Sequence, residues 1–146
     1  MDVKRFAIGT IVGGITMYVV GYLIFTLIFG AYYAANVGPV TNAMREPTLQ
    51  WANALGGFAF AALITYVIAE SGRLPTIAAG FMKGATTGFL AWLSVDLVYY
   101  GATNLWNFSI VILDPVLEFV HSGIGGAVIA AVLSRVPGSI EVRTAN

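Results

Sequence analysis

Long apolar stretches alternate with short polar connections along almost the whole chain. The four stretches cover residues 6–29, 47–69, 75–100 and 115–135. An α-helix rises about 1.5 Å per residue, so about 20 residues cross a bilayer core that is about 30 Å thick, and each stretch reaches that length. The pattern therefore predicts an all-α membrane protein with four transmembrane helices, forming a single domain over residues 1–146.

The composition excludes several classes of function. Hydrophobic residues make up 58% of the chain and charged residues only 10%, whereas a soluble domain usually has about 25% charged residues. The formal net charge is +0, so no basic patch is available to neutralise nucleic-acid phosphates. The sequence has no cysteine, P-loop, nucleophile elbow or HExxH motif. We therefore expect a non-enzymatic protein whose partner is the lipid bilayer, with no cofactor and no nucleic acid.

The basic residues predict the orientation of the chain. Cytoplasmic connections of membrane proteins carry an excess of Lys and Arg. Only Arg45 lies at the opposite ends of the predicted helices from the other basic residues. The first apolar stretch is longer than the roughly 7 to 15 residues of a cleaved signal peptide, so we expect it to remain as a helix. The prediction is a bacterial inner-membrane protein with both termini in the cytoplasm. The basic residues on the predicted cytoplasmic side are Lys4, Arg5, Arg73, Lys83, Arg135 and Arg143.

The two halves of the sequence resemble each other. With an offset of 71 positions, Gly9 and Gly13 fall on Gly80 and Gly84. With an offset of 69, Leu-Gly-Gly at 55–57 falls on Ile-Gly-Gly at 124–126. Halves with an even number of crossings insert in the same direction. We therefore predict two similar helical hairpins in a parallel pseudo-twofold bundle, with chance matching of glycine-rich helices as the alternative.

An acidic residue precedes a proline in each half, as Glu46-Pro47 and Asp114-Pro115. An acidic N-cap followed by proline at the first helical position is a common start of a helix. These two pairs are therefore predicted to begin the second and fourth helices.

Small residues recur at four-residue spacing, which places them on one face of a helix and lets neighbouring backbones approach closely. The leading hypothesis is accordingly a structural or accessory subunit that assembles through these faces, within the bundle, with a second copy or in a larger membrane complex. The helix-packing candidates are Gly9, Gly13, Gly80, Gly84, Gly88 and Gly126, with Gly57 and Ala61 on the second helix.

Ionisable residues inside the apolar stretches are the candidates for any chemistry, because a charge in the bilayer core is costly. Asp114, Glu118 and His121 project from one face of the fourth stretch, and Asp96 lies in the outer half of the third. One interpretation is structural: Asp114 caps its helix, Glu118 reaches the headgroup water, and His121 bonds near Asp96 or Asn53. The other is a polar pocket, open to the outer face, that binds a cation or small polar solute or passes protons. The alternative function is thus a small transporter or a ligand- or ion-binding membrane protein.

Glu118 and His121 also form the Glu-x-x-His spacing of helical-bundle metal sites. Such sites need a second pair, and the second helix has Leu49 and Ala52 at the equivalent positions. We therefore predict no metal site within one copy. A symmetric dimer could supply the second pair, and a lone membrane histidine could also ligate a tetrapyrrole.

Two regions carry a resemblance to a known family. These are Gly21–Phe25 continuing through Phe29–Asn36, and Val95–Leu105, in which Asp96 is followed by Tyr-Tyr-Gly-Ala-Thr-Asn at 99–104. Both resemble a group of small bacterial four-helix integral membrane proteins that carry a domain of unknown function. The resemblance covers most of the chain and implies a four-helix membrane fold. It implies no activity, and His121 lies outside the family pattern, which weakens a metal or pigment role.

Overall fold

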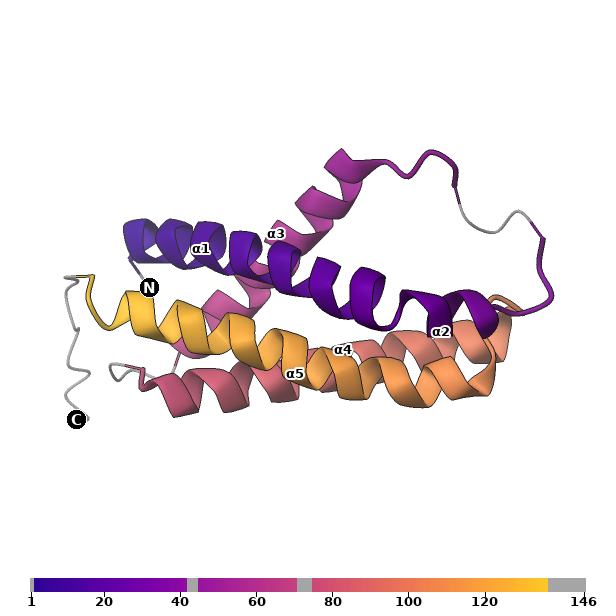
Figure 1. Ribbon diagram of the computed structural model, residues 1–146. Coiled ribbons are helices and arrows are strands. Elements are labelled where there is room, and N and C mark those ends of the chain that lie inside the picture. Colours follow the sequence, from indigo (N-terminus) through magenta and orange to yellow (C-terminus); the bar gives the residue numbers. More distant parts are fainter. Residues whose placement is uncertain (1, 42–44, 71–74, 137–146) are drawn as a thin grey trace.

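The computed structural model describes residues 2–41, 45–70 and 75–136 (Figure 1). Over these ranges the chain is helical, and its only extended pairing is an isolated bridge between Val37 and Trp106. The prediction of an all-α fold is therefore confirmed for this part of the chain. The elements are α1 (Val3–Gly21), the π-helix η1 (Tyr22–Ile28), α2 (Gly30–Ala35), α3 (Gln50–Ala69), α4 (Ile77–Ala102) and α5 (Phe108–Leu133).

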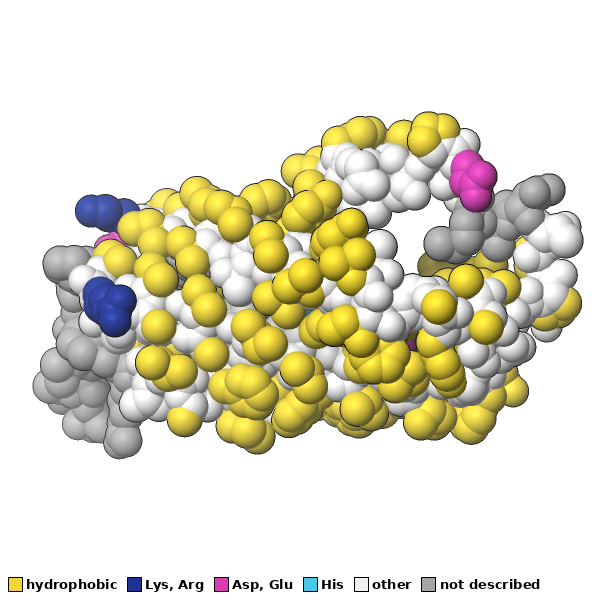
Figure 2. All heavy atoms as spheres, viewed as in Figure 1, with side chains coloured by type: hydrophobic (Ala, Val, Ile, Leu, Met, Phe, Trp, Pro, Cys, Tyr) yellow, Lys and Arg dark blue, Asp and Glu magenta, His cyan; other side chains and the backbone are white. Residues whose placement is uncertain are grey.

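Three of the described helices are long and apolar enough to cross a membrane: Val3–Ile28, Gln50–Ala69 and Phe108–Leu133. Their outward faces carry large apolar side chains that are about half exposed, such as Ile15 at 55% and Ile112 at 54%. Figure 2 shows such side chains spread over most of the visible surface, and the basic side chains that can be seen in this view lie at one end. A soluble monomer rarely exposes so continuous an apolar surface, so these helices are suited to insertion into lipid.

α4 and α5 have 26 residues each and lie antiparallel, side by side (Figure 1). Gly80, Gly84 and Gly88 of α4 lie directly against α5, where a Cβ atom on any of them would collide with Gly126 or Ser122. The absence of side chains brings the two backbones into direct contact, the arrangement by which helices pack in lipid.

α1 crosses over both α3 and α5. Gly9 lies against Thr65 of α3, and Gly13 lies against Ala61 of α3 and Ile129 of α5. The residues around these contacts form the apolar core where the three helices meet. The core consists of Met17, Ala61, Ile64, Ile68, Ile129 and Leu133, with Phe60 packed against it.

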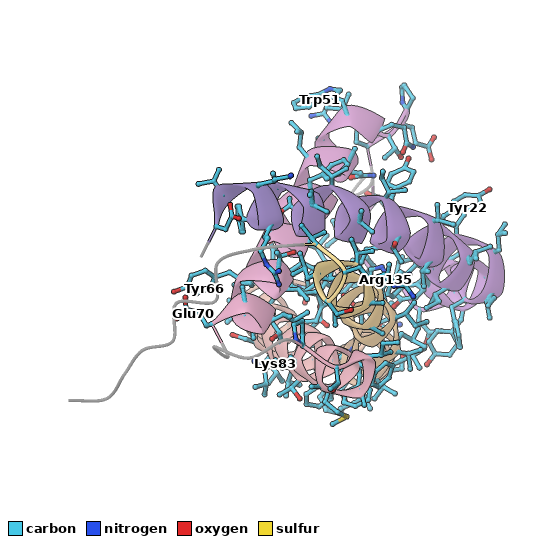
Figure 3. The ribbon with its side chains drawn as sticks, turned by 90° about the vertical axis from the view of Figure 1, so that its left-hand side faces the viewer. Tyr22, Trp51, Tyr66, Glu70, Lys83 and Arg135 are labelled. Atoms are coloured by element: carbon cyan, nitrogen blue, oxygen red, sulfur yellow. The ribbon has the colours of Figure 1, made fainter. Side chains whose placement is uncertain are left out.

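The N-terminal half of α3 diverges from the rest of the bundle (Figure 1). Trp51, in its first turn, is 65% exposed and lies apart from the other helices in the end-on view of Figure 3. A Cβ atom at Gly56 or Gly57 would meet nothing within 4 Å. Gly57 therefore does not pack against a helix of the same chain, because α3 has already separated from α1 at that position. The alternative, contact with a second copy, stays a prediction.

The two acid-proline pairs do not begin helices. α3 begins at Gln50, after Glu46-Pro47, and α5 begins at Phe108 with Asn107 at its N-cap, so that Pro115 lies inside the helix. Proline removes only one backbone donor, and the apolar residues 108–113 continue the helix ahead of it. The prediction that Asp114 caps the helix is wrong, because its side chain accepts a hydrogen bond from Tyr33 instead.

The first apolar stretch is not one regular helix. After Gly21 the chain continues as the π-helix η1, whose wider turn is illustrated by the bond from the Phe29 amide to the Ile24 carbonyl at 2.9 Å. π-Helical segments are rare and often lie at functional sites. Here η1 lies between α1 and α2 and connects them.

The N-terminus of α1 and the C-terminus of α5 lie at the same end of the molecule (Figure 1). The Arg5 guanidinium donates a 2.6 Å hydrogen bond to the Val136 carbonyl there. Lys83 donates to the Val67 carbonyl at 3.1 Å, near the C-terminus of α3, where a cation complements the helix dipole. Arg73 and Arg143, counted on this side from the sequence, lie outside the described residues.

Candidate functional site: a polar cleft between α1, α3 and α5

The divergence of α3 opens a cleft of about 940 Å³ between α1, η1, α3 and α5. Figure 2 shows the molecule hollowed between the start of α3 and the rest of the bundle. The lining combines aromatic and apolar side chains with hydrogen-bonding and ionisable groups. The apolar lining includes Met17, Tyr22, Phe25, Phe60 and Trp92, and the polar lining includes Tyr18, Gln50, Asn53, Asp114, Glu118 and His121.

Glu118 and His121 form a buried pair on α5. The Nδ1 atom of His121 lies 2.9 and 3.0 Å from the two carboxyl oxygens of Glu118. The Nε2 atom lies 2.8 Å from the backbone carbonyl oxygen of Met17 on α1. The Ser122 hydroxyl, one turn after Glu118, donates to Glu118 Oε1. The pair therefore joins α5 to α1 at the base of the cleft.

The Met17 carbonyl determines how protons are distributed in this pair. A carbonyl oxygen only accepts hydrogen bonds, so Nε2 of His121 must carry a proton. Nδ1 then shares one further proton with Glu118, either as an imidazolium beside a carboxylate or as a neutral imidazole beside a carboxylic acid. Both forms have no net charge, which suits a site with little exposure to water.

Asp114 and Asp96 form a second polar centre, one turn from Glu118. The Tyr33 hydroxyl of α2 donates to Asp114 Oδ1. Burial and the neighbouring Asp114 raise the pKa of Tyr33, so its hydroxyl keeps the proton and acts as the donor. Asp96 of α4 lies close enough to Asp114 for their carboxyl groups to interact directly. Asp96 is only 4% exposed, and its Oδ2 atom has no hydrogen-bond partner among the described residues.

Aromatic rings surround the polar groups. Phe60 of α3 and Trp92 of α4 pack in a tilted arrangement, with a centroid distance of 4.9 Å and an interplanar angle of 54°. Phe25 of η1 packs edge-on against His121, with centroids 5.5 Å apart, and also against Tyr33. The π-helical turn thus holds an aromatic side chain over the histidine, so a ligand would meet apolar and acidic groups together.

The structure brings four of the five predicted ligand-binding candidates to one cleft. Asp114, Glu118, His121 and Asn53 line it, whereas Asp96 is not among the lining residues and interacts with Asp114. His121 was expected to form its hydrogen bonds within the bundle near Asp96 or Asn53, and its partners there are Glu118 and the Met17 carbonyl.

Sequence reasoning missed several contributors. Ser122 follows Glu118 by one helical turn, so helical spacing alone could have indicated it. Nothing in the sequence indicated Tyr33 or the Met17 carbonyl, because both reach the site from another helix. Within residues 2–41, 45–70 and 75–136, no group of three or more Asp, Glu or His side chains is arranged to hold a metal ion.

Comparison with models of protein families, with curated proteins and with solved structures gave no match. The resemblance to small bacterial four-helix membrane proteins stays a prediction.

Proposed function

We propose that this protein is a small membrane protein that binds or transports a small solute in the cleft between α1, α3 and α5. The observation that carries the proposal is that Asp114, Glu118 and His121 line a cavity of about 940 Å³. Ionisable residues in membrane-spanning helices are costly and usually mark a substrate, ion or proton pathway. A cavity of this size, apolar with a few convergent polar groups, is also typical of ligand sites.

The contacts of the glycine faces give less support to a purely structural role. Gly9 and Gly13 of α1 pack against α3 and α5, and Gly80, Gly84 and Gly88 pack against α5. These faces are occupied within one chain. A second copy or a larger complex would therefore have to contact other surfaces, such as the open face at Gly56 and Gly57 of α3.

We also propose four membrane crossings, with α4 as the fourth. α4 is as long as α5 and packs beside it, but Lys83, Asp96 and its glycines make it less apolar than the other three helices. The proposed topology places both termini in the cytoplasm of a bacterial inner membrane, since Lys4, Arg5 and Arg135 lie at one end. The pairs α1–α3 and α4–α5 would be the two hairpins of the parallel pseudo-twofold bundle.

Reporter fusions test this topology. Green fluorescent protein fused after Arg135 is expected to fluoresce, and alkaline phosphatase fused after Val40 is expected to be active, because the first reporter folds in the cytoplasm and the second only outside it. Exchanging the two reporters at these positions provides the control and should abolish both signals. Activity of alkaline phosphatase after Arg135 would contradict the proposed orientation.

Filling the cleft tests the proposed function. Gly57 lies on α3 one turn before the fully buried Ala61, and a side chain at Gly57 meets no atom within 4 Å. Gly57→Leu should therefore occupy the cleft without a clash, and should stabilise α3 by about 0.5–1 kcal/mol through helix propensity. We expect native mass spectrometry of the detergent-released protein to show a non-lipid small molecule on the wild type, with occupancy about tenfold lower on Gly57→Leu.

Gly101→Leu is the matched control, because Gly101 also faces open space but lies at the far end of α4, outside the cleft. It should keep the wild-type occupancy. A wild-type protein that is free of small molecules and unchanged by either substitution would favour the structural role instead.

A further inference from the structure

Acidic side chains outnumber basic ones among the residues that line the cleft. Asp114 and Glu118 line it, and neither Lys nor Arg is among the lining residues. The side chains of Arg5 and Lys83 donate hydrogen bonds to the backbone carbonyls of Val136 and Val67, which are not among the residues that line the cleft. The lining His121 is already bonded to Glu118 and to the Met17 carbonyl, so an entering solute meets Asp114 as an acceptor for positive charge.

The aromatic lining of the cleft favours a solute that also has an apolar part. Phe60 and Trp92 form a tilted aromatic pair in the cleft, and Phe25 and Tyr22 border it from η1. Aromatic faces attract cations as well as apolar groups, and the attraction strengthens where water is excluded. The lining thus suits a molecule that has both a positive charge and an apolar body.

Asp96 is a buried acidic group with one unsatisfied carboxyl oxygen. Its side chain is 4% exposed, it contacts Asp114, and its Oδ2 atom has no donor among the described residues. A buried carboxylate oxygen without a donor is unfavourable. Two neighbouring carboxyl groups in this setting cannot both ionise, so they hold a proton between them until another positive charge arrives.

We propose that the solute of the cleft is an amphipathic organic cation, and that it enters in exchange for the proton held by Asp96 and Asp114. This proposal rests on the proposed function. When the cation lies beside Asp114, both carboxyl groups ionise and one proton leaves to water. One positive charge enters and one leaves, so the net charge of the site does not change and no covalent bond to the cation is formed.

The Glu118–His121 pair has a different role in this exchange. The Met17 carbonyl holds Nε2 of His121 protonated, and Glu118 already has Nδ1 and Ser122 as partners. The groups that face the Asp96–Asp114 centre are Tyr33 from α2, Asp96 from α4, and Glu118 and His121 from α5. Of these, Tyr33 already donates to Asp114, and Glu118 and His121 are hydrogen-bonded to each other, which leaves Asp96 and Asp114 to release the proton.

Calorimetry with a matched pair of probes tests the exchange on the full-length protein in detergent. Benzyltrimethylammonium is the cation, and neopentylbenzene, in which carbon replaces the charged nitrogen, is its neutral isostere. Titrations in two buffers of different protonation enthalpy measure the number of protons released. Gly57→Leu in the same detergent corrects for probe that partitions into the micelle. We expect the wild type to bind the cation with release of about one proton, and to bind the neutral isostere at least about tenfold more weakly.

Asp96→Asn should still bind the cation but release no proton, because the amide can donate to an ionised Asp114. Asp114→Asn should weaken cation binding about tenfold and also release no proton, so it provides the same test if Asp96→Asn does not fold. Equal binding of both probes without proton release would overturn the exchange while leaving a solute-binding cleft, provided that Gly57→Leu still blocks it. Failure of the wild type to bind either probe would also overturn the exchange, and native mass spectrometry would then decide the proposed function separately.

Discussion

Gly84→Ala is expected to destabilise the bundle by about 1–3 kcal/mol, the usual cost of overpacking a tight contact. A Cβ atom at Gly84 would meet the Ser122 carbonyl oxygen and, at 3.0 Å, the Cα atom of Gly126. Both are backbone atoms of α5, so no side-chain rotation relieves the clash and the helices must separate. The measurement is the free energy of unfolding in mixed micelles, with denaturing detergent as the variable.

Gly101→Ala is the control for this prediction. It makes the same chemical change in α4, but a Cβ atom at Gly101 meets nothing within 4 Å. Its stability should equal or slightly exceed that of the wild type, because alanine favours a helix over glycine. Equal stability of Gly84→Ala and Gly101→Ala would show that α4 and α5 are not in backbone contact at this position.

Glu118→Ala is expected to have the larger effect, a loss of about 3–5 kcal/mol, as for other buried pairs from which one partner is removed. Glu118 is 1% exposed, and its carboxyl group accepts from Ser122 and contacts Nδ1 of His121. Without it, a buried imidazole with a polar nitrogen remains unpaired, and a cavity is left between α5 and α1. Unfolding in mixed micelles again provides the measurement.

A double substitution separates the pair from the general cost of mutating the core. Glu118→Leu with His121→Leu removes both polar groups and fills the space with apolar atoms, and the Ser122 hydroxyl can turn to a backbone carbonyl of its own helix. We expect the double variant to recover most of the stability that the Glu118→Ala variant lacks. A double variant that is less stable than either single variant would contradict the view that the two groups act as one neutral unit.

The predicted cluster of site residues followed from helical spacing. Asp114, Glu118 and His121 recur at intervals of a helical turn, so any helix over this stretch presents them on one face. The predicted start of that helix was wrong. The Asp114-Pro115 pair fits an N-cap as well as it fits the interior of a helix, and only the contact with Tyr33 shows the role of the aspartate. The sequence predicted that Asp96 faces protein rather than lipid. It could not predict that Asp114 is its neighbour, because α4 and α5 could pack against each other in several registers.

The sequence by itself determined that the described chain is helical, that its helices are apolar enough for a membrane, and that few ionisable groups lie within them. These properties follow from composition and from the period of a single helix, which need no knowledge of neighbours. Only the tertiary structure decided that α3 leaves α1 near Gly57, that Met17 fixes the proton on His121, and that Asp96 meets Asp114. The physical reason is that cavities and buried hydrogen bonds depend on how separate helices cross and tilt, and packing between helices determines those angles.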